Sequence, residues 1–406
     1  MINAGIFYVI SILLLGLSDF SEKLKKYRYI FFFLILLVIW GGNRFNGADW
    51  INYINVYRGF NDENSILNVI YLGRFEWLFS IWMWIFSRAG IPYEGFVASI
   101  ALVNILCLLW VIKKVRIESI GLCLITLFLI EGWTLYHEQL RQAIALSICL
   151  VAAVHFLNNR KRLAYFLIVF STGFHSSAFF SLLFFYVINR VLRRKNAPLS
   201  LHEIILTSLA IVSSVGIVVV AMKLGVLNLI GLSRLQEKFE YYETDQLSGS
   251  SLINVGMIAY LLGFCILLWY RKTVLRQRVA WLSFAWSMAI LWCFLGPWLR
   301  IFAIFTRFEH YLIIFIPFAV CVYSSSADQN VKQIAQRTLI TILFSATFFI
   351  RIALNPEHQI WVLNYQNVFV SLIFDMHLDN VDVRKDVICE NFSQYDNNFC
   401  GEFSSK

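Results

Sequence analysis

The sequence predicts an all-α polytopic integral membrane protein. Of its 406 residues, 59% are hydrophobic and only 15% are charged, whereas an ordinary soluble domain has about 45–50% apolar and about 25% charged residues. The apolar residues occur in runs of roughly 15–20, the length at which a helix crosses a hydrocarbon core about 30 Å thick. The net charge of +9 comes from short basic clusters beside these runs, a pattern typical of cytoplasmic loops. A soluble enzyme and a nucleic-acid-binding protein are therefore excluded.

About twelve transmembrane helices are expected where apolar runs are bounded by charges or turn residues. The first run, Ile2 to Leu17, has no Lys or Arg before it, so it lacks the basic start of a cleaved signal peptide and is expected to be a retained span. The twelve spans are predicted near residues 2–18, 29–42, 96–112, 120–134, 140–157, 163–175, 176–192, 204–222, 252–270, 279–295, 308–323 and 338–354.

The basic residues predict which loops face the cytoplasm. Six clusters between the spans hold 20 of the 34 Lys and Arg residues, and loops rich in Lys and Arg lie on the cytoplasmic side. This places both termini and the long stretches 41–95, 223–251 and 296–307 on the outer, periplasmic side.

The segment from Phe75 to Phe86 conflicts with this topology, because a span there would invert every later loop. Its twelve residues reach only about 18 Å as a helix. We therefore predict a re-entrant or interfacial helix near 75–86 with both ends outside. A tilted full span, with a weak local charge bias, is the alternative.

Two domains are expected: a transmembrane domain over 1–354 and an acidic periplasmic tail over 355–406. After Leu354 the tail has eight acidic residues and three basic ones. Its two cysteines, Cys389 and Cys400, are a candidate disulfide in an oxidising compartment. The other six cysteines lie within predicted spans, where cysteine acts as a small hydrophobic residue.

Soluble-enzyme signatures are absent: the sequence has no Walker loop, no nucleotide-binding glycine fingerprint, no HExxH and no CxxC. No cofactor or metal is expected. Charged residues near span ends then become the candidates, since charge at that depth is costly. Glu138, Arg141 and Gln142 open the span that runs to Leu157. An arginine at a helix N-terminus opposes the helix dipole and favours a bound anion such as a diphosphate; a simple Glu138–Arg141 ion pair is the alternative.

Further candidates lie at the outer ends of other spans. His175 ends a span among small residues and could accept a proton near neutral pH, although a lone histidine in such a place is more often a hydrogen-bonded residue of a packing interface. Asp49 and Tyr53 share a helix face four residues apart and suit carbohydrate binding, or membrane-interface anchoring. Arg44 precedes them. Glu76 lies at the start of the predicted re-entrant helix, beside Arg74, and a simple ion pair between these two residues is the alternative.

The late arginines Arg300 and Arg307 are seven residues apart, two turns on one helix face. Together they suit a diphosphate, and Tyr311 begins the span that follows. A salt bridge from an arginine to Glu309 is the alternative.

These motifs, taken in order, resemble the EpsG family of Wzy-type bacterial exopolysaccharide polymerases. The similarity covers roughly residues 40–190, and more loosely Arg307 to Pro317. The stretches that carry it are Arg44…Gly47-Ala-Asp49…Tyr53, Glu76 before an aromatic helix, Arg141-Gln142-Ala-Ile-Ala, the basic turn Asn159-Arg-Lys-Arg and Phe174-His175-Ser-Ser-Ala.

The resemblance implies a membrane glycosyltransferase at the outer face of the inner membrane. It would transfer a growing glycan from undecaprenyl diphosphate to a lipid-linked oligosaccharide repeat unit, for O-antigen, capsule or exopolysaccharide. Arg141 and Arg307 would stabilise the leaving diphosphate, and His175, Asp49 or Glu138 would act as the base. Arg44, Tyr53, Glu76, Gln142, Arg300 and Tyr311 would bind substrate. Expected partners are the lipid-linked units, membrane lipids and a chain-length regulator. A lipid-linked oligosaccharide flippase or another secondary transporter is the alternative, although such proteins place charges near the bilayer middle.

Overall fold

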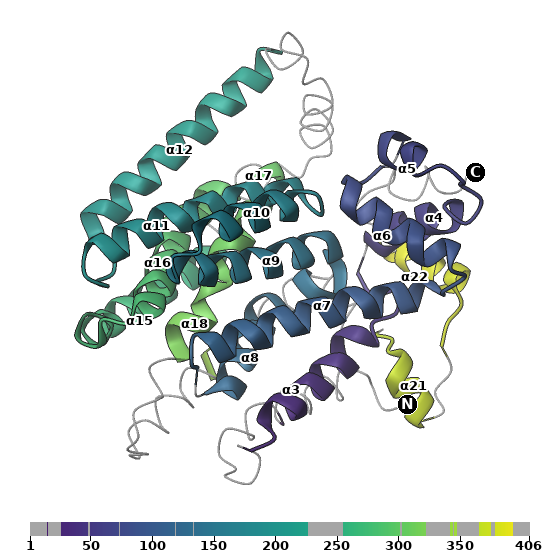
Figure 1. Ribbon diagram of the computed structural model, residues 1–406, viewed down its shortest axis with the longest axis horizontal. Coiled ribbons are helices and arrows are strands. Elements are labelled where there is room, and N and C mark those ends of the chain that lie inside the picture. The colour runs from purple at the N-terminus through teal and green to yellow at the C-terminus, as the bar shows by residue number, and fades with distance from the viewer. Residues whose placement is uncertain are drawn as a thin grey trace. The chain divides into compact units, whose positions relative to one another are not determined.

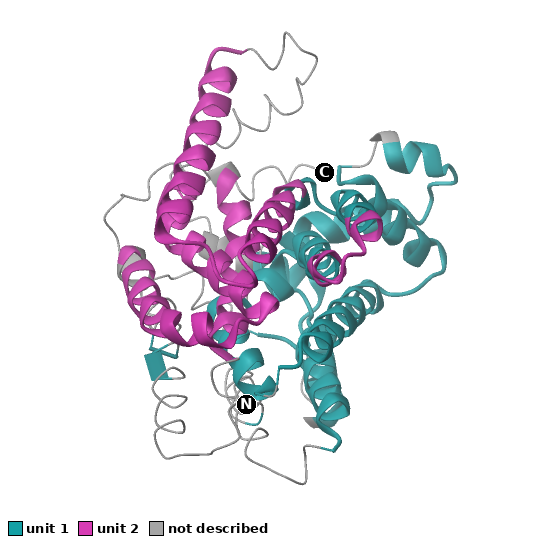
Figure 2. Cartoon of the chain, turned by 60° about the vertical axis from the view of Figure 1, so that its left-hand side comes forward, with its two compact units in different colours: residues 1–152, 165–178, 327–406 teal, residues 153–164, 179–326 magenta. Residues whose placement is uncertain are grey.

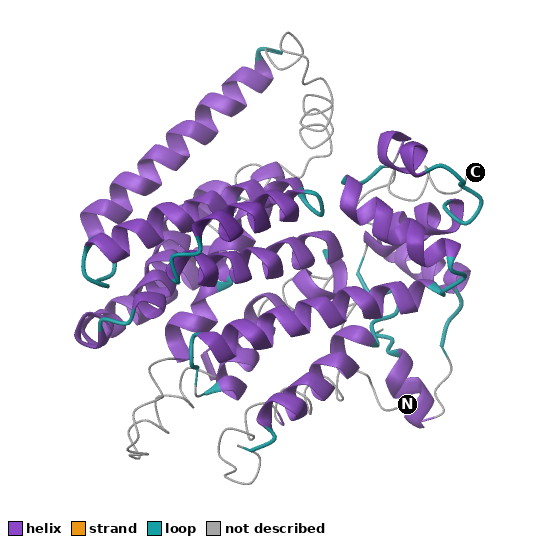
Figure 3. Cartoon of the chain, in the orientation of Figure 1, coloured by secondary structure: helices purple, strands orange, loops and turns teal. Residues whose placement is uncertain are grey.

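The described part of the chain consists of helices joined by loops and turns (Figure 3). The computed structural model describes residues 14, 26–47, 49–72, 74–117, 119–132, 134–225, 255–300, 303–321, 342–343, 345–346, 365–374 and 378–392. Within these ranges the all-α prediction is confirmed, and the sole extended pairing is an isolated bridge between Asn43 and Asn367.

The chain divides into two compact units (Figure 2). Unit 1 comprises residues 1–152, 165–178 and 327–406, and unit 2 comprises residues 153–164 and 179–326. The domain boundary predicted after residue 354 stays a prediction. Each unit is described here by itself.

Unit 1 begins with two helices that pack together. Helix α3 (Arg28–Leu36) continues into a π-helical turn (Leu37–Gly41), and both lie against α7 (Tyr93–Lys114). Between them in sequence come three shorter helices, α4 (Asp49–Gly59), α5 (Ile66–Leu72) and α6 (Trp77–Arg88), which Figure 1 draws close together. Helix α6 has twelve residues, the length expected for the segment near 75–86.

The second half of unit 1 contains an interrupted helix. Helix α8 (Ile120–Leu127) is followed by two π-helical turns (Phe128–Gly132 and Thr134–Glu138), and α9 (Leu140–Leu157) then begins. Such wide turns often mark functional sites. Helix α10 (Lys161–Thr172), a 3₁₀ turn (Ser176–Ser181), α21 (Val368–Phe374) and α22 (Val381–Phe392) follow. The end of α9 and the start of α10, residues 153–164, and residues 179–181 of the 3₁₀ turn belong to unit 2.

Unit 2 is built around the buried helix α16 (Ala280–Leu299). Helix α16 contacts five other helices: α11 (Leu182–Arg193), α12 (Leu201–Lys223), α15 (Val255–Gln277), α17 (Ala303–Ile313) and α18 (Phe315–Cys321). Aromatic rings fill this core: Phe284 lies 4.8 Å from Phe315 and 5.9 Å from Phe184 between ring centroids. The rings interlock edge to face, an arrangement that favours a specific packing.

Four described helices are long and apolar enough to cross a membrane: α7, α9, α12 and α16. Two shorter apolar segments, Arg28–Gly41 and Ile120–Gly132, coincide with predicted spans 29–42 and 120–134. The count of about twelve spans is not confirmed and stays a prediction. The spans predicted at 2–18 and 338–354 lie, apart from a few positions, outside the described residues.

Candidate functional site

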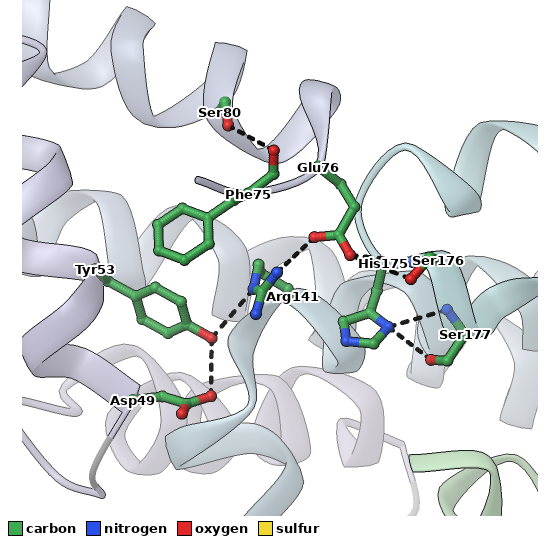
Figure 4. Close-up of polar contacts among 9 residues, drawn as sticks. All are labelled: Asp49, Tyr53, Phe75, Glu76, Ser80, Arg141, His175, Ser176 and Ser177. Atoms are coloured by element: carbon green, nitrogen blue, oxygen red, sulfur yellow. Dashed lines mark hydrogen bonds and ion pairs between the residues drawn. The ribbon is translucent and has the colours of Figure 1, made fainter. Parts of the chain in front are cut away.

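A series of polar contacts connects four segments of unit 1 (Figure 4). The Tyr53 hydroxyl donates to Oδ2 of Asp49 at 3.1 Å and accepts from Nε of Arg141 at 3.5 Å. Nη1 of Arg141 forms an ion pair with Oε2 of Glu76 at 2.5 Å. The other oxygen of Glu76, Oε1, accepts from the backbone N–H of Ser176 at 3.2 Å. Residues from α4, α6, α9 and the turn after α10 thus form one network.

The first segment is positioned by a tight turn before α4. Asp49 is the first residue of α4 and Tyr53 lies one turn later, so the shared face expected from the sequence is present. Gly47 has a φ of +86°, and a Cβ built there would lie 2.8 Å from Cβ of Glu138 and 3.2 Å from its Cα. Only glycine combines that conformation with such a close approach. This contact holds the start of α4 against the segment that leads into α9.

Glu76 is the residue that precedes α6. In the first turn of α6, the backbone N–H groups of Leu78 and Phe79 donate to the carbonyl oxygen of Gly173 at 2.9 and 3.4 Å. This contact places Glu76 beside Ser176. Burial alone would raise the pKa of Glu76, but the charge of Arg141, together with the hydrogen bond from the backbone N–H of Ser176, lowers it from 4.5 to about 2. Glu76 is therefore an anion at any physiological pH.

Arg141 is the second residue of α9 and lies in an aromatic environment. Its guanidinium carbon is 4.7 Å from the ring centroid of Phe75 and 5.8 Å from that of Tyr53, distances suited to cation–π attraction. Its side chain is 13% exposed. The ion pair that the sequence suggested was with Glu138; the partner in the structure is Glu76. Within the described residues, Nη2 of Arg141 donates no hydrogen bond.

His175 is buried and its ring contacts Ser177. The backbone N–H of Ser177 donates to Nδ1 of His175 at 3.2 Å, and the Ser177 hydroxyl lies 2.6 Å from the same nitrogen. A backbone N–H can only donate, so Nδ1 accepts and carries no proton. The neutral ring must then carry its proton on Nε2, the nitrogen that faces away from Ser177 in Figure 4.

Other predicted residues of unit 1 lie around this network. Nε of Arg44 forms an ion pair with Glu94 at 3.2 Å. Gln142 follows Arg141 in α9 and is buried, and Glu138 lies against Gly47. The structure therefore brings Asp49, Tyr53, Glu76 and Arg141 into one network, and His175 directly precedes Ser176, whose backbone N–H donates to Glu76. Arg44, Gln142 and Glu138 lie on neighbouring segments.

The late candidates belong to unit 2. Arg300 pairs with the buried Glu309 through Nε to Oε2 at 2.8 Å and Nη2 to Oε1 at 3.1 Å. The same Oε1 accepts from the Tyr260 hydroxyl at 2.7 Å and from Trp292 Nε1 at 2.8 Å. For Arg300, the salt bridge that the sequence left open as an alternative is present.

Two further unit 2 candidates differ in exposure. Arg307 is half-buried. Tyr311 is fully buried, with its ring 6.4 Å from that of Phe180. Substrate binding by Arg300, Arg307 and Tyr311 stays a prediction.

The described residues form neither a metal site nor the predicted disulfide. No group of three metal-binding side chains is found among the residues that the structure describes. The predicted pair of Cys389 and Cys400 lies outside the described side chains.

Sequence reasoning missed three contributions to the network. The pairing of Arg141 with Glu76 joins residues 65 positions apart, and no local spacing indicates it. The Phe75 ring under Arg141 and the contact of Ser177 with His175 were also not foreseen. The adjacency of Ser177 to His175 in sequence was the one available signal, because Ser side chains often bond to groups two residues away.

The family comparison covers most of the chain. No curated protein and no solved structure shows significant similarity to it. The model of the EpsG family matches residues 7–367, which extends the resemblance seen at residues 40–190 to nearly the whole chain and confirms it. Together with its apolar helices, this match shows that the chain belongs to the EpsG family, a family of Wzy-like polymerase-type membrane proteins involved in exopolysaccharide biosynthesis.

Proposed function

We propose that the chain is a polysaccharide polymerase that joins lipid-linked repeat units at the outer face of the inner membrane. It transfers a growing glycan from undecaprenyl diphosphate to a sugar hydroxyl of a new lipid-linked unit. The observation that carries this proposal is the network centred on Arg141, which combines hydrogen-bond donors for a leaving diphosphate with a carboxylate that can serve as a base.

Arg141 is proposed to stabilise the leaving group. The C–O bond between the anomeric carbon and the diphosphate breaks with its electron pair, so negative charge grows on the diphosphate oxygens. Nη2 of Arg141 has no partner among the described residues and can donate to those oxygens. Because Glu76 already balances the charge of Arg141, the guanidinium acts mainly through oriented N–H groups. Such donors favour the charge of the transition state over that of the bound substrate.

His175 is proposed to be a second donor to the diphosphate. With Nδ1 accepting from the backbone N–H of Ser177, the neutral ring carries its proton on Nε2 and cannot take another proton at that atom. In the substrate complex we propose that this N–H donates to an oxygen of the leaving group. Of the three base candidates from the sequence, His175 is therefore the least suited to proton removal.

Asp49 is proposed to be the base. Its Oδ2 accepts from Tyr53, while Oδ1 accepts no hydrogen bond from a described residue, and the side chain is half-exposed. The acceptor hydroxyl attacks the anomeric carbon through its oxygen, and its proton passes to Oδ1 of Asp49. Tyr53 links Asp49 to Arg141 and so holds the base and the leaving-group donor at a fixed spacing.

Arg44 and Gln142 flank this network and are proposed to bind the sugars. Arg307 and Tyr311 remain proposed contacts for the lipid diphosphate or glycan. Arg300, which is paired with Glu309, is proposed to act through the part of its side chain that stays exposed. Partners other than the lipid-linked units, including a chain-length regulator, are likewise proposals.

The distribution of surface glycan in cells lacking the protein tests this function. A polymerase mutant should display single capped repeat units in place of a ladder of long chains, and the wild-type gene should restore the ladder. Complete loss of surface repeat units would instead indicate a flippase and would contradict the proposal. Complementation with Arg190→Lys, a change at an ion pair far along the chain in α11, serves as the control for expression.

A further inference from the structure

Residues 365–368, at the start of α21, pack onto the turn that precedes α4. The backbone N–H of Val368 donates to the carbonyl of Gly42 at 2.8 Å, and that of Arg44 donates to Gln366 at 3.3 Å. Nδ2 of Asn46 donates to the backbone carbonyl of Gln366 at 2.8 Å, and the backbone N–H of Gln366 donates to Oδ1 of Asn46 at 3.0 Å. The two segments are therefore tied by reciprocal hydrogen bonds although more than 300 residues separate them.

The same segment also caps the π-helical turn before this region. The hydroxyl of Tyr365 donates to the carbonyl of Ile39 at 2.8 Å, and Nδ2 of Asn367 donates to that of Val38 at 2.7 Å. Carbonyl groups at a helix end need such partners when they are buried. The end of the helix is thus completed by residues from the far end of the chain.

Arg384 of α22 adds a buried cation to this contact. It is only 3% exposed. Nε donates to the carbonyl of Phe45 at 3.2 Å, and Nη2 donates to Oδ1 of Asn46 at 3.4 Å. Burial lowers the pKa of Arg384 to about 10, against the opposing influence of Asp379, so the side chain stays charged at neutral pH. Gln366 in turn donates to Asp379, which anchors the segment before α22.

The turn that Arg384 contacts has an unfavourable backbone. Phe45 has a φ of +51°, which a residue with a Cβ rarely adopts, and Gly47 has a φ of +86°. Such conformations persist only where surrounding contacts enforce them. Asp49 begins α4 two positions after Gly47, so the direction of this turn sets where Asp49 and Tyr53 lie.

The family match ends at residue 367. Helices α21 and α22 therefore lie beyond the region that defines the family, yet α22, drawn in yellow in Figure 1, supplies a buried contact to a turn inside it.

We propose that helices α21 and α22 form a C-terminal positioning element, and that Arg384 is a positioning residue that fixes the Phe45–Gly47 turn and thereby the placement of Asp49. The catalytic part of this inference rests on the proposed function. The positioning part does not, because it concerns the conformation of the turn alone.

The test uses the full-length protein in detergent micelles and two readouts. In Arg384→Gln, amide hydrogen exchange in residues 43–53 should become about 10- to 100-fold faster, the effect of losing a buried charged hydrogen bond. Exchange in α16 of unit 2 should be unchanged. Asp386→Asn, an exposed change on the same helix, should exchange like the wild type. Arg384→Lys, which keeps the charge and one donor, should restore part of the protection.

Polymerisation assays on the same variants test the consequence for the site. We expect the kcat of chain extension to fall about tenfold or more in Arg384→Gln, with KM changed less than about threefold, since a displaced base slows chemistry more than binding. Unchanged exchange in residues 43–53 would overturn the proposal, and so would faster exchange with a wild-type kcat. If Arg384→Gln unfolds globally, Arg384→Lys becomes the test variant. Wild-type exchange in residues 43–53 together with a wild-type kcat in Arg384→Lys would then overturn the proposal. A wild-type protein that makes no polymer would refute the proposed function and leave the exchange result as the test of positioning.

Discussion

Replacing Arg141 by lysine separates a hydrogen-bonding role from a purely electrostatic one. Lysine can keep a charge beside Glu76, which lies 2.5 Å from Nη1 in the wild type. It cannot reproduce the planar fork that also reaches Tyr53 through Nε and presents Nη2. The loss for folding should be modest, about 1 kcal/mol, because the ion pair persists and one long hydrogen bond and part of a cation–π contact disappear.

The expected loss for catalysis is much larger. Removing one preorganised donor from the charge that develops in a transition state typically costs a factor of about 10²–10³ in rate. Arg141→Lys should therefore lower the rate of chain extension by about that factor, measured in membrane vesicles as release of lipid diphosphate and as glycan length on a gel. Thermal stability of the purified variant checks that it still folds.

Arg190→Lys is the matched control. Arg190 donates to Glu203 at 2.6 Å in unit 2, an ion pair of similar length that has no place in the proposed mechanism. It should retain activity within about twofold, as expected for a partly exposed pair. An Arg141→Lys protein with activity within about threefold of the wild type would refute the assignment of Arg141 to the diphosphate.

Three further predictions follow from the same network. Asp49→Asn should lower the rate of chain extension by a factor of about 10²–10⁴, as loss of a general base does. His175→Gln still offers an N–H donor and should lower this rate by less than about tenfold. The opposite order in the same vesicle assay would indicate that His175 is the base. Gly47→Ala should destabilise the protein by about 2–4 kcal/mol because it adds a clash with Glu138 to the cost of a positive φ. Gly90→Ala is the control: Gly90 has a φ of +67° but open space around it, so the substitution should cost only about 1 kcal/mol. Equal losses of stability in thermal unfolding would contradict the close approach of Gly47 to Glu138. Because the pKa of Glu76 is lowered from 4.5 to about 2 in the folded protein, its contribution to stability is fully present above about pH 4.5 and is lost as the pH falls toward 2; unfolding followed between pH 6 and 3 should show this loss, and Glu76→Gln should flatten that part of the profile.

Much of the fold followed from hydrophobic periodicity. The predicted spans 96–112, 140–157, 204–222 and 279–295 correspond to α7, α9, α12 and α16 within a few residues, because long apolar runs have one stable arrangement in a bilayer. Helix α6 has the twelve-residue length expected for the segment near 75–86, shifted by two residues. Interruptions were not foreseen: the π-helical turn Phe128–Gly132 lies inside the predicted span 120–134. A change of hydrogen-bond register leaves no mark on hydrophobic pattern.

The site was predicted as a set of residues but not as a set of contacts. Asp49 and Tyr53 could be placed together because their spacing fixes a helix face. The partner of Arg141 could not, since local spacing favoured Glu138 and the actual partner, Glu76, comes from another helix. Arg384 was equally hidden, because a lone arginine in an acidic tail gives no sign that it is buried against a turn near residue 45. Long-range pairs of this kind depend on tertiary packing, which a single sequence does not encode in any local pattern.

Reconstitution of the purified protein in lipid vesicles, with lipid-diphosphate-linked repeat units as the only substrate, tests the central claim most directly. A polymerase predicts a ladder of glycans whose length increases with time, with one lipid diphosphate released for each linkage formed and both processes lost together in Asp49→Asn. Movement of intact repeat units across the bilayer without any longer product would contradict it.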